Sequence, residues 1–235
     1  MSDSSKILVV LTSHGKLGNT GKPTGWYLPE LAHPYSVLTR QGFSLTLASP
    51  AGGPAPLDPS SVEASANDTV SQSFLAEHKS LWESTTPLES FLGRAAEFAA
   101  VFFPGGHGPM FDLASDPTSQ ALIQEFASNG KVVAAVCHGP AALVGVKGPK
   151  GESFLKGKKV TGFSNAEERE VGLEQVVPFL LEDKLVEAVG KGGKYEKAAE
   201  KWGEKVVVDG KLITGQNPAS AKGVAEEIVK AVWGA

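Results

Sequence analysis

Cys137 is the residue best suited to covalent chemistry, and it is the only cysteine in the 235-residue chain. His138 follows it directly, and Gly139 and Pro140 come next, so a sharp turn is expected at this point. A cysteine presented at such a turn can act as a nucleophile, because backbone N–H groups at the start of a following helix stabilise a thiolate and an oxyanion. Most free cysteines are instead small buried core residues. Cys137 alone leaves both interpretations open.

A second turn with chemical content spans residues 104–108, with the sequence Pro-Gly-Gly-His-Gly. It does not match the glycine fingerprint of dinucleotide-binding loops, because Phe111 stands where the third glycine is required. The glycines instead bring the backbone close to whatever lies above the turn. His107 can contribute to chemistry there, or it can simply shape the turn and hydrogen-bond within it.

Both turns follow apolar runs that predict buried strands. Residues 131–136 precede Cys137, residues 99–103 precede the glycine turn, and residues 6–12 form a third such run. Strands alternate with predicted helices along the chain, which favours an α/β fold: a flavodoxin-like three-layer sandwich around a mainly parallel sheet. Because the carboxyl ends of parallel strands form the usual ligand crevice, we expect the two turns to converge there, with Cys137 on a nucleophile elbow.

Helix and hairpin signals complete this organisation. A helix is expected over residues 26–40, with Pro34 kinking or ending it, and Glu30 near its start is by local pattern an ordinary first-turn acid. Asp116 is expected to cap a helix that runs to residue 128, and Asn165 is a possible cap of another. Residues 206–214 predict a β-hairpin around an Asp-Gly turn, followed by a last helix.

Residues 49–86 differ from the rest of the chain. The segment is rich in proline and serine, and its few large apolar residues include Phe74 and Trp82. A long segment of this kind inside an α/β chain is usually functional. We interpret it as a cap or lid inserted into a single α/β domain that spans residues 1–235.

The composition excludes several classes of protein. The net charge is −4 and no run of Lys or Arg occurs, so nucleic acid is not an expected partner. No apolar stretch is long enough to span a membrane. One cysteine forms no internal disulfide, and residues 1–5 do not resemble a signal peptide. We therefore expect a cytoplasmic protein, with the nucleus as an alternative location.

Taken together, these motifs resemble the ThiJ/PfpI superfamily, whose cysteine elbow is shared with class I glutamine amidotransferases. The resemblance is specifically to the fungal and bacterial class of heat-induced chaperones with glutathione-independent glyoxalase, or glyoxalase III, activity. It covers the chain from Lys6 to about Trp233. The motifs that carry it are Ala135–Pro140, Pro104–Gly108, the first apolar run, Glu30 before His33-Pro34, and Thr214–Ser220.

The resemblance implies a set of site residues. Cys137 matches the family nucleophile and His138 its histidine partner. Glu30 matches the acid that touches the nucleophile. An acid downstream orients the histidine, and alignment on residues 161–163 selects Glu168, although the neighbouring glutamates leave that register open. Trp26, together with residues 49–86, corresponds to an aromatic cap over the site.

The implied reaction is the conversion of methylglyoxal, a small 2-oxoaldehyde, to D-lactate through a hemithioacetal on Cys137. Glu30 or His138 would move the proton, and backbone N–H groups of His138 and of Gly106 or His107 would stabilise the oxyanion. No metal or organic cofactor is expected, and a homodimer is implied by the family. Alternatives are a holdase chaperone for misfolded client proteins, a redox sensor, and a cysteine-dependent deglycase or peptidase.

Overall fold

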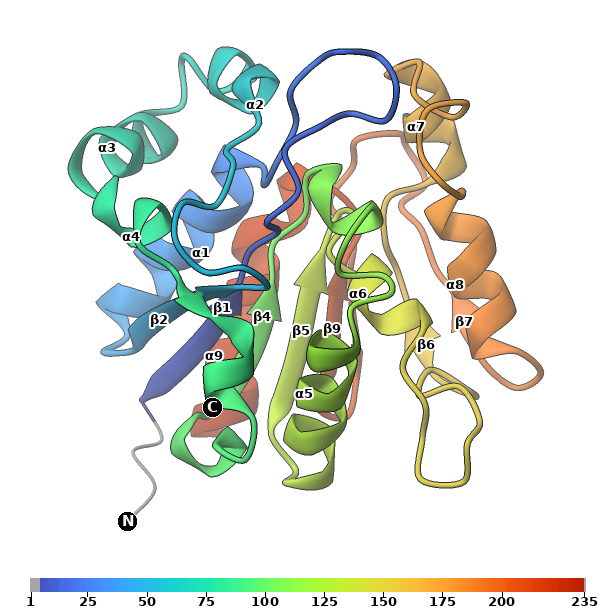
Figure 1. Cartoon of the computed structure of the whole chain (residues 1–235). Helices are drawn as coiled ribbons and strands as arrows, with labels where there is room; N and C mark the ends of the chain where they lie inside the picture. The colour runs from blue at the N-terminus through green and yellow to red at the C-terminus, as the bar shows by residue number, and fades with distance from the viewer. Residues whose placement is uncertain (1–4, 235) are drawn as a thin grey trace.

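The computed structural model describes residues 5–234, so the expectation about a signal peptide falls largely outside the described residues. Seven strands form one sheet in the order β3-β2-β1-β4-β5-β9-β8 (Figure 1). All neighbouring strands run parallel except β8, which is antiparallel to β9. The mainly parallel sheet is therefore confirmed. In sheet order, the strands are Thr86–Pro87, Ser44–Ser49, Lys6–Val10, Ala100–Phe103, Val132–Val136, Leu212–Gly215 and Val206–Asp209.

Helices cover both faces of the sheet. Helices α1 (Leu28–Arg40) and α9 (Ala221–Trp233) pack together behind the sheet in Figure 1, and α5 (Pro117–Ser128) lies in front with α6 (Ala141–Val144). This is the expected three-layer sandwich. Beyond β5 the chain adds α7 (Asn165–Glu170), α8 (Leu181–Val189) and a separate parallel pair, β6 (Lys159–Val160) and β7 (Lys194–Tyr195).

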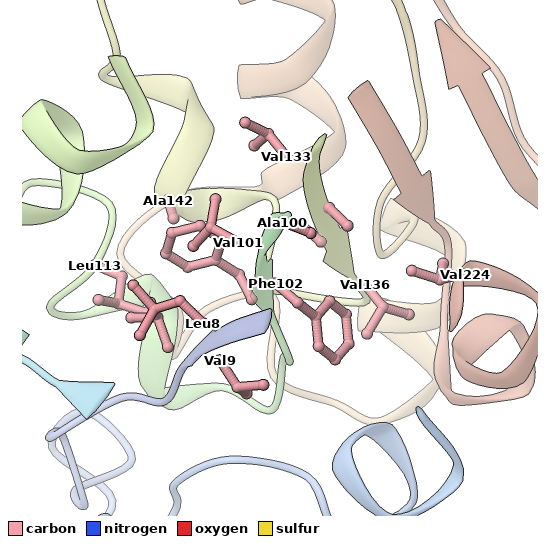
Figure 2. Close-up of a cluster of buried hydrophobic side chains, with 14 of the residues drawn as sticks. Leu8, Val9, Ala100, Val101, Phe102, Leu113, Val133, Val136, Ala142 and Val224 are labelled. Carbon is pink, nitrogen blue, oxygen red and sulfur yellow. The ribbon is translucent and has the colours of Figure 1, made fainter. Parts of the chain in front are cut away.

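The central strands are buried on both faces, which explains their uninterrupted apolar sequences. Every residue of β4 and β5 is buried. Figure 2 shows that successive side chains alternate: Leu8 and Val101 point toward the face with Leu113 and Ala142, and Phe102 points the other way. The central strands are thus fixed on both faces, and their carboxyl ends form a rigid base for the loops above.

Several local predictions are confirmed, and the prediction of Asn165 as a helix cap is wrong. The hairpin forms around Asp209-Gly210, and Asp116 Oδ1 accepts a hydrogen bond from the Ser119 N–H at 2.6 Å. Asn165, however, is the first residue of α7, and Ser164 is its cap, within a capping box that includes Glu167. Pro34 lies inside α1 and does not end it, and a kink at Pro34 stays a prediction.

Residues 49–86 are more helical than their composition predicts. They contain α2 (Pro59–Ala64), α3 (Thr69–Glu77) and α4 (Ser80–Glu83), and aspartates cap the first two helices. Phe74 and Trp82 are buried and stack with ring centroids 5.5 Å apart. The segment packs on α1 at one flank of the sheet (Figure 1). Its role as a lid stays a prediction. No helix within residues 5–234 is long and apolar enough to cross a membrane.

Candidate active site

Cys137 lies at the turn between β5 and α6, with its backbone in the left-handed region at φ 61°. This conformation is strained for a residue with a side chain, and such strain is common at nucleophile elbows. Gly139 makes the turn feasible, because a Cβ on it would lie 2.1 Å from the Phe103 carbonyl oxygen. The apolar strand and the glycine behind it therefore place the thiol above the carboxyl end of the sheet.

The imidazole of His138 folds back toward the cysteine, as joint action of the two residues requires. Cys137 Sγ lies 3.5 Å from His138 Nδ1, and His138 Nε2 lies 2.7 Å from Glu168 Oε2. All three side chains are buried. Burial acts to raise the pKa of Glu168, but the two neighbouring histidines outweigh it and hold that pKa below its usual range. Glu168 is thus ionised and only accepts, so His138 carries its proton on Nε2 and turns a lone pair toward the sulfur.

His107 binds the other oxygen of the same carboxylate. Its Nε2 lies 2.9 Å from Glu168 Oε1, and the centroids of the two imidazole rings are 4.2 Å apart. The His107 side chain is 14% exposed, compared with 1% for His138. Burial, and then the proximity of His107, lower the pKa of His138. One glutamate thus orients two histidines, of which only His107 borders solvent.

The other glutamates of α7 have different partners. Glu167 is fully buried and accepts hydrogen bonds from Ser164 and from the side-chain amides of Gln216 and Asn217. Glu170 is exposed and accepts from the Lys201 ammonium and the Trp202 indole. The register that sequence alone left open is therefore decided by hydrogen bonding: of these three acids, only Glu168 contacts His138.

Glu30 reaches the site from the first turn of α1. It is fully buried, and its Oε2 accepts a hydrogen bond from the Gly105 N–H at 2.7 Å. Its Oε1 has no hydrogen-bond partner among residues 5–234. Burial raises the pKa of Glu30 to about 8, although hydrogen bonds from Cys137 and Gly105 act in the opposite direction. Pro29 occupies one of the first positions of α1, so it does not disturb the helix that carries Glu30.

The thiol itself is a weak acid in this environment. Burial, and then the charge of Glu30, raise the pKa of Cys137 well above its ordinary value, while the Gly106 N–H opposes this shift. The sequence pattern predicts the opposite, a thiol activated by the N-terminus of the following helix. That effect is small here because α6 has only four residues and begins at Ala141, beyond the elbow. A base beside the sulfur is needed to remove its proton, and Glu30 and His138 both lie there.

A cavity of about 580 Å³ opens above the sulfur. Cys137, His138, His107 and Gly106 form its base. Its walls come from the loop between β1 and α1, from α2 and its cap, from the segments on either side of α7, and from the loops before β8 and after β9. The residues are Leu17, Lys22, Pro23, Tyr27, Asp58, Pro59, Ser60, Glu63, Phe163, Val171, Leu173, Trp202 and Pro218. Four of these residues lie in segment 49–86, so that segment borders the site.

Trp26 lies beside the cavity and not in its wall. Its side chain is fully buried, and its indole N–H donates to the Ala55 carbonyl at 3.3 Å. The adjacent Tyr27 lines the cavity instead. Sequence reasoning missed Tyr27, Phe163 and Trp202. Their only sequence signal is that each is an aromatic residue, a property that many core residues share.

His107, His138 and Glu168 also form the one group of described residues whose donor atoms lie close enough to hold a metal ion, all within 4.8 Å. Two imidazoles and a carboxylate are suitable ligands for a divalent cation such as zinc. The same atoms hydrogen-bond to one another in this structure, so a bound metal would replace the contact that orients His138. The chemistry proposed below uses these residues without a metal.

An α/β sandwich with a strained cysteine elbow, a buried histidine–glutamate pair and a second buried glutamate defines a class of cysteine-centred α/β proteins. The sequence pattern of the DJ-1/PfpI family matches residues 25–231. The chain therefore belongs to the DJ-1/PfpI family.

Known relatives resemble this chain over nearly its whole length. Glyoxalase 3 of Candida albicans is 33% identical, over 96% of this chain and 98% of its own. The glutathione-independent glyoxalase HSP31 of Saccharomyces cerevisiae is 32% identical, over 97% and 98% of the two chains. Among solved structures, the 24 kDa Rapid Encystment Protein of Francisella tularensis is 39% identical, with a TM-score of 0.90 over 97% of this chain and 99% of its own.

Proposed function

We propose that this protein is a glutathione-independent glyoxalase that converts methylglyoxal to D-lactate, with Cys137 as the nucleophile. The observation that carries this proposal is the position of the Cys137 sulfur. It lies at the base of a cavity, 3.5 Å from His138 Nδ1 and against the buried carboxyl group of Glu30. The conversion of an oxoaldehyde to a hydroxy acid oxidises one carbon and reduces its neighbour. It requires a nucleophile with proton-transferring groups beside it, and Cys137 has two such groups.

The first step forms a carbon–sulfur bond. The Cys137 sulfur adds to the aldehyde carbon of methylglyoxal, and the thiol proton moves through a neighbouring base to the new oxygen, which gives a hemithioacetal. The lone pair on His138 Nδ1 faces the sulfur and receives this proton. The resulting imidazolium is stabilised by ionised Glu168, 2.7 Å from Nε2. His107 shares that carboxylate and so moderates its charge.

The second step moves a proton between adjacent carbons. Ionised Glu30 removes the proton from the former aldehyde carbon, and the electron pair passes through an enediolate to the neighbouring carbonyl carbon. Glu30 returns the proton to that carbon, and the hydroxyl proton of the hemithioacetal passes to the former ketone oxygen, which gives a thioester with a hydroxyl group next to it. No external oxidant is needed, because one carbon is oxidised as its neighbour is reduced. The raised pKa of Glu30, about 8, suits a group that both takes and returns a proton.

The last step is hydrolysis of the thioester. Water, deprotonated by His138, attacks the thioester carbon, and the carbon–sulfur bond breaks to release D-lactate and restore the thiol. The Gly106 N–H is directed at the sulfur, and the His138 N–H has no backbone acceptor among residues 5–234. These two groups are our candidates for an oxyanion hole.

The proposal is tested with purified protein, methylglyoxal and no added thiol. We expect D-lactate to form, and we expect Cys137→Ala to lower kcat/KM by about a thousandfold or more, because no other thiol exists in the chain. Glu187→Gln is a control outside the site, since Glu187 lies exposed on α8 and its carboxylate contacts Lys184. Lactate production by Cys137→Ala at the wild-type rate would refute the mechanism.

The other predictions from the resemblance remain proposals. A homodimer, a holdase role toward misfolded clients, redox sensing and deglycase or peptidase activity are all compatible with a buried thiol above an α/β sheet. A cytoplasmic location is likewise still a prediction. Sedimentation measures whether the protein is a homodimer, and protection of a heated client protein from aggregation measures the holdase role.

A further inference from the structure

Two described residues other than glycine have a left-handed backbone, and both line the same cavity. They are Cys137 at φ 61° and Trp202 at φ 62°. A residue with a bulky side chain is energetically disfavoured in this region, and residues held in such conformations cluster at functional sites. The strain at Cys137 serves the nucleophile elbow. The proposed glyoxalase mechanism does not use Trp202, so catalysis does not explain its strained backbone.

Trp202 is held in place by the helix that also orients the histidine. Its backbone N–H donates to Glu167 Oε1 at 3.1 Å, and its indole N–H donates to Glu170 Oε1 at 2.9 Å. Lys201 binds the same Glu170 side chain. The indole is thus fixed at both its backbone and its ring, and α7 positions it relative to Glu168.

The indole extends a row of aromatic rings that begins at the catalytic histidine. Phe163 lies against His138, with ring centroids 4.3 Å apart, and Trp202 meets Phe163 edge to face at 5.6 Å. Val171 and Leu173 line the cavity on the same side. Trp202 is 38% exposed and Val171 is 41% exposed. Large apolar side chains that face an open cavity mark a surface for an apolar ligand group.

The opposite wall of the cavity carries charged and hydroxyl side chains beside the apolar Leu17, Pro23 and Pro59. It includes Asp58, Ser60 and Glu63, which belong to α2 or its cap, and Lys22 from the loop after β1. Figure 1 shows α2 and α7 on opposite sides of that blue loop, above the carboxyl end of the sheet. The cavity of about 580 Å³ is also far larger than methylglyoxal, which has only three carbons. The site therefore has an unused apolar wall next to the sulfur.

We propose that the preferred substrates are 2-oxoaldehydes R–CO–CHO in which R is a bulky apolar or aromatic group. R lies on Phe163 and Trp202, while the aldehyde carbon lies at the Cys137 sulfur. This inference rests on the proposed glyoxalase activity and names its substrate class. The balance of the reaction is unchanged: phenylglyoxal and one water molecule give D-mandelate through the same thioester.

The experiment compares phenylglyoxal, methylglyoxal and the polar hydroxypyruvaldehyde as substrates of wild-type protein and of Trp202→Ala. We expect wild-type kcat/KM to be at least about tenfold higher for phenylglyoxal than for the other two, because an apolar pocket discriminates through added buried groups. Trp202→Ala should lose about tenfold more of its kcat/KM for phenylglyoxal than for methylglyoxal. The loss should appear mainly in KM, and Trp202→Phe should restore most of it.

Trp233→Ala is the matched control. Trp233 is also exposed, but it stacks on Phe43 at the end of α9, away from the cavity. Its substitution should leave the preference among the three substrates unchanged. A wild-type preference for hydroxypyruvaldehyde, or equal losses for all substrates in Trp202→Ala, would overturn the inference while leaving the glyoxalase proposal intact.

A binding measurement separates the two proposals. The unreactive ketols 2-hydroxyacetophenone and hydroxyacetone carry the same R groups without an aldehyde. We expect the phenyl compound to bind wild type about tenfold more tightly than the methyl compound and to lose that advantage in Trp202→Ala. If that binding pattern holds but no oxoaldehyde is turned over, the glyoxalase proposal fails and the apolar subsite stands. Equal binding of the two ketols overturns the subsite.

Discussion

Burial of Glu30 destabilises the folded protein when the side chain is ionised, and the same burial suits the side chain to proton transfer. An isolated buried carboxylate is costly, so the folded protein keeps a proton on Glu30 up to a pKa of about 8. One of its oxygens accepts a hydrogen bond from the Gly105 N–H, and the other has no hydrogen-bond partner among the described residues. A side chain chosen for stability alone would not be ionisable here. The same raised pKa makes it an effective proton shuttle near neutral pH.

Glu30→Gln should therefore stabilise the protein and lower its activity. Between pH 4.5, the ordinary carboxyl value, and about pH 8, the folded state holds a proton that the unfolded chain has lost. The free energy of unfolding of the wild type thus falls as pH rises through this window. Glutamine does not titrate, so we expect the variant to be more stable by roughly 3 kcal/mol at pH 7, and by little at pH 4.5.

Denaturant unfolding of both proteins between pH 4.5 and 8.5 measures this difference. Glu63→Gln, an exposed glutamate at the cavity rim, should show no such pH-dependent gain. Wild-type kcat should rise by about tenfold from pH 7 to pH 9 as Glu30 ionises, and Glu30→Gln should lose that rise. A stability difference that did not vary with pH would mean that Glu30 is already ionised in the folded protein.

Helix α7 carries three nearby glutamates with three separate tasks. Glu167 ties the helix to the loop after β9, Glu168 orients the histidines, and Glu170 holds Trp202 and Lys201 at the surface. Because Glu167 and Glu168 are both buried, the start of this short helix is stabilised by hydrogen bonds and not by an apolar face alone. The element therefore combines structural anchoring with positioning of the site.

Glu167→Ala should destabilise the protein by about 2–4 kcal/mol. It would leave the buried amides of Gln216 and Asn217 without their shared acceptor and would remove half of the capping box. Glu170→Ala removes only exposed contacts and should leave the stability of the protein almost unchanged. Equal effects of the two substitutions on denaturant midpoints would show that the buried network contributes no stability of its own.

At the scale of the whole molecule, the sheet and segment 49–86 form one continuous packing unit. Seven strands share one sheet, and Trp82 of the segment meets Trp26 with ring centroids 5.3 Å apart. Trp26 in turn belongs to the main core. A lid with its own core would not share aromatic contacts of this kind with the domain below it.

We therefore expect a single cooperative unfolding transition. Far-ultraviolet circular dichroism follows the sheet and helices. In a variant with Trp202→Phe and Trp233→Phe, tryptophan fluorescence follows Trp26 and Trp82 at the junction, so the two midpoints should coincide. A loss of fluorescence signal before the loss of secondary structure would instead identify residues 49–86 as a separately unfolding lid.

Local sequence patterns determined much of this protein. The apolar runs of the central strands, the Asp-Gly hairpin and the cap at Asp116 depend on neighbouring residues alone, and the structure contains each of them. The elbow at Cys137 also follows from local chemistry, because a strand that ends in small and turn-forming residues has few other conformations.

Tertiary structure alone decided how the site is assembled. Glu30 appears in the sequence as a plain first-turn acid, and its high pKa arises only because α1 packs it under the Gly105 turn. The choice of Glu168 over Glu167, the burial of Trp26 and the exposure of Trp202 depend on contacts between residues far apart in the chain. Burial and hydrogen-bond partners are properties of such contacts, and a local sequence pattern does not contain them.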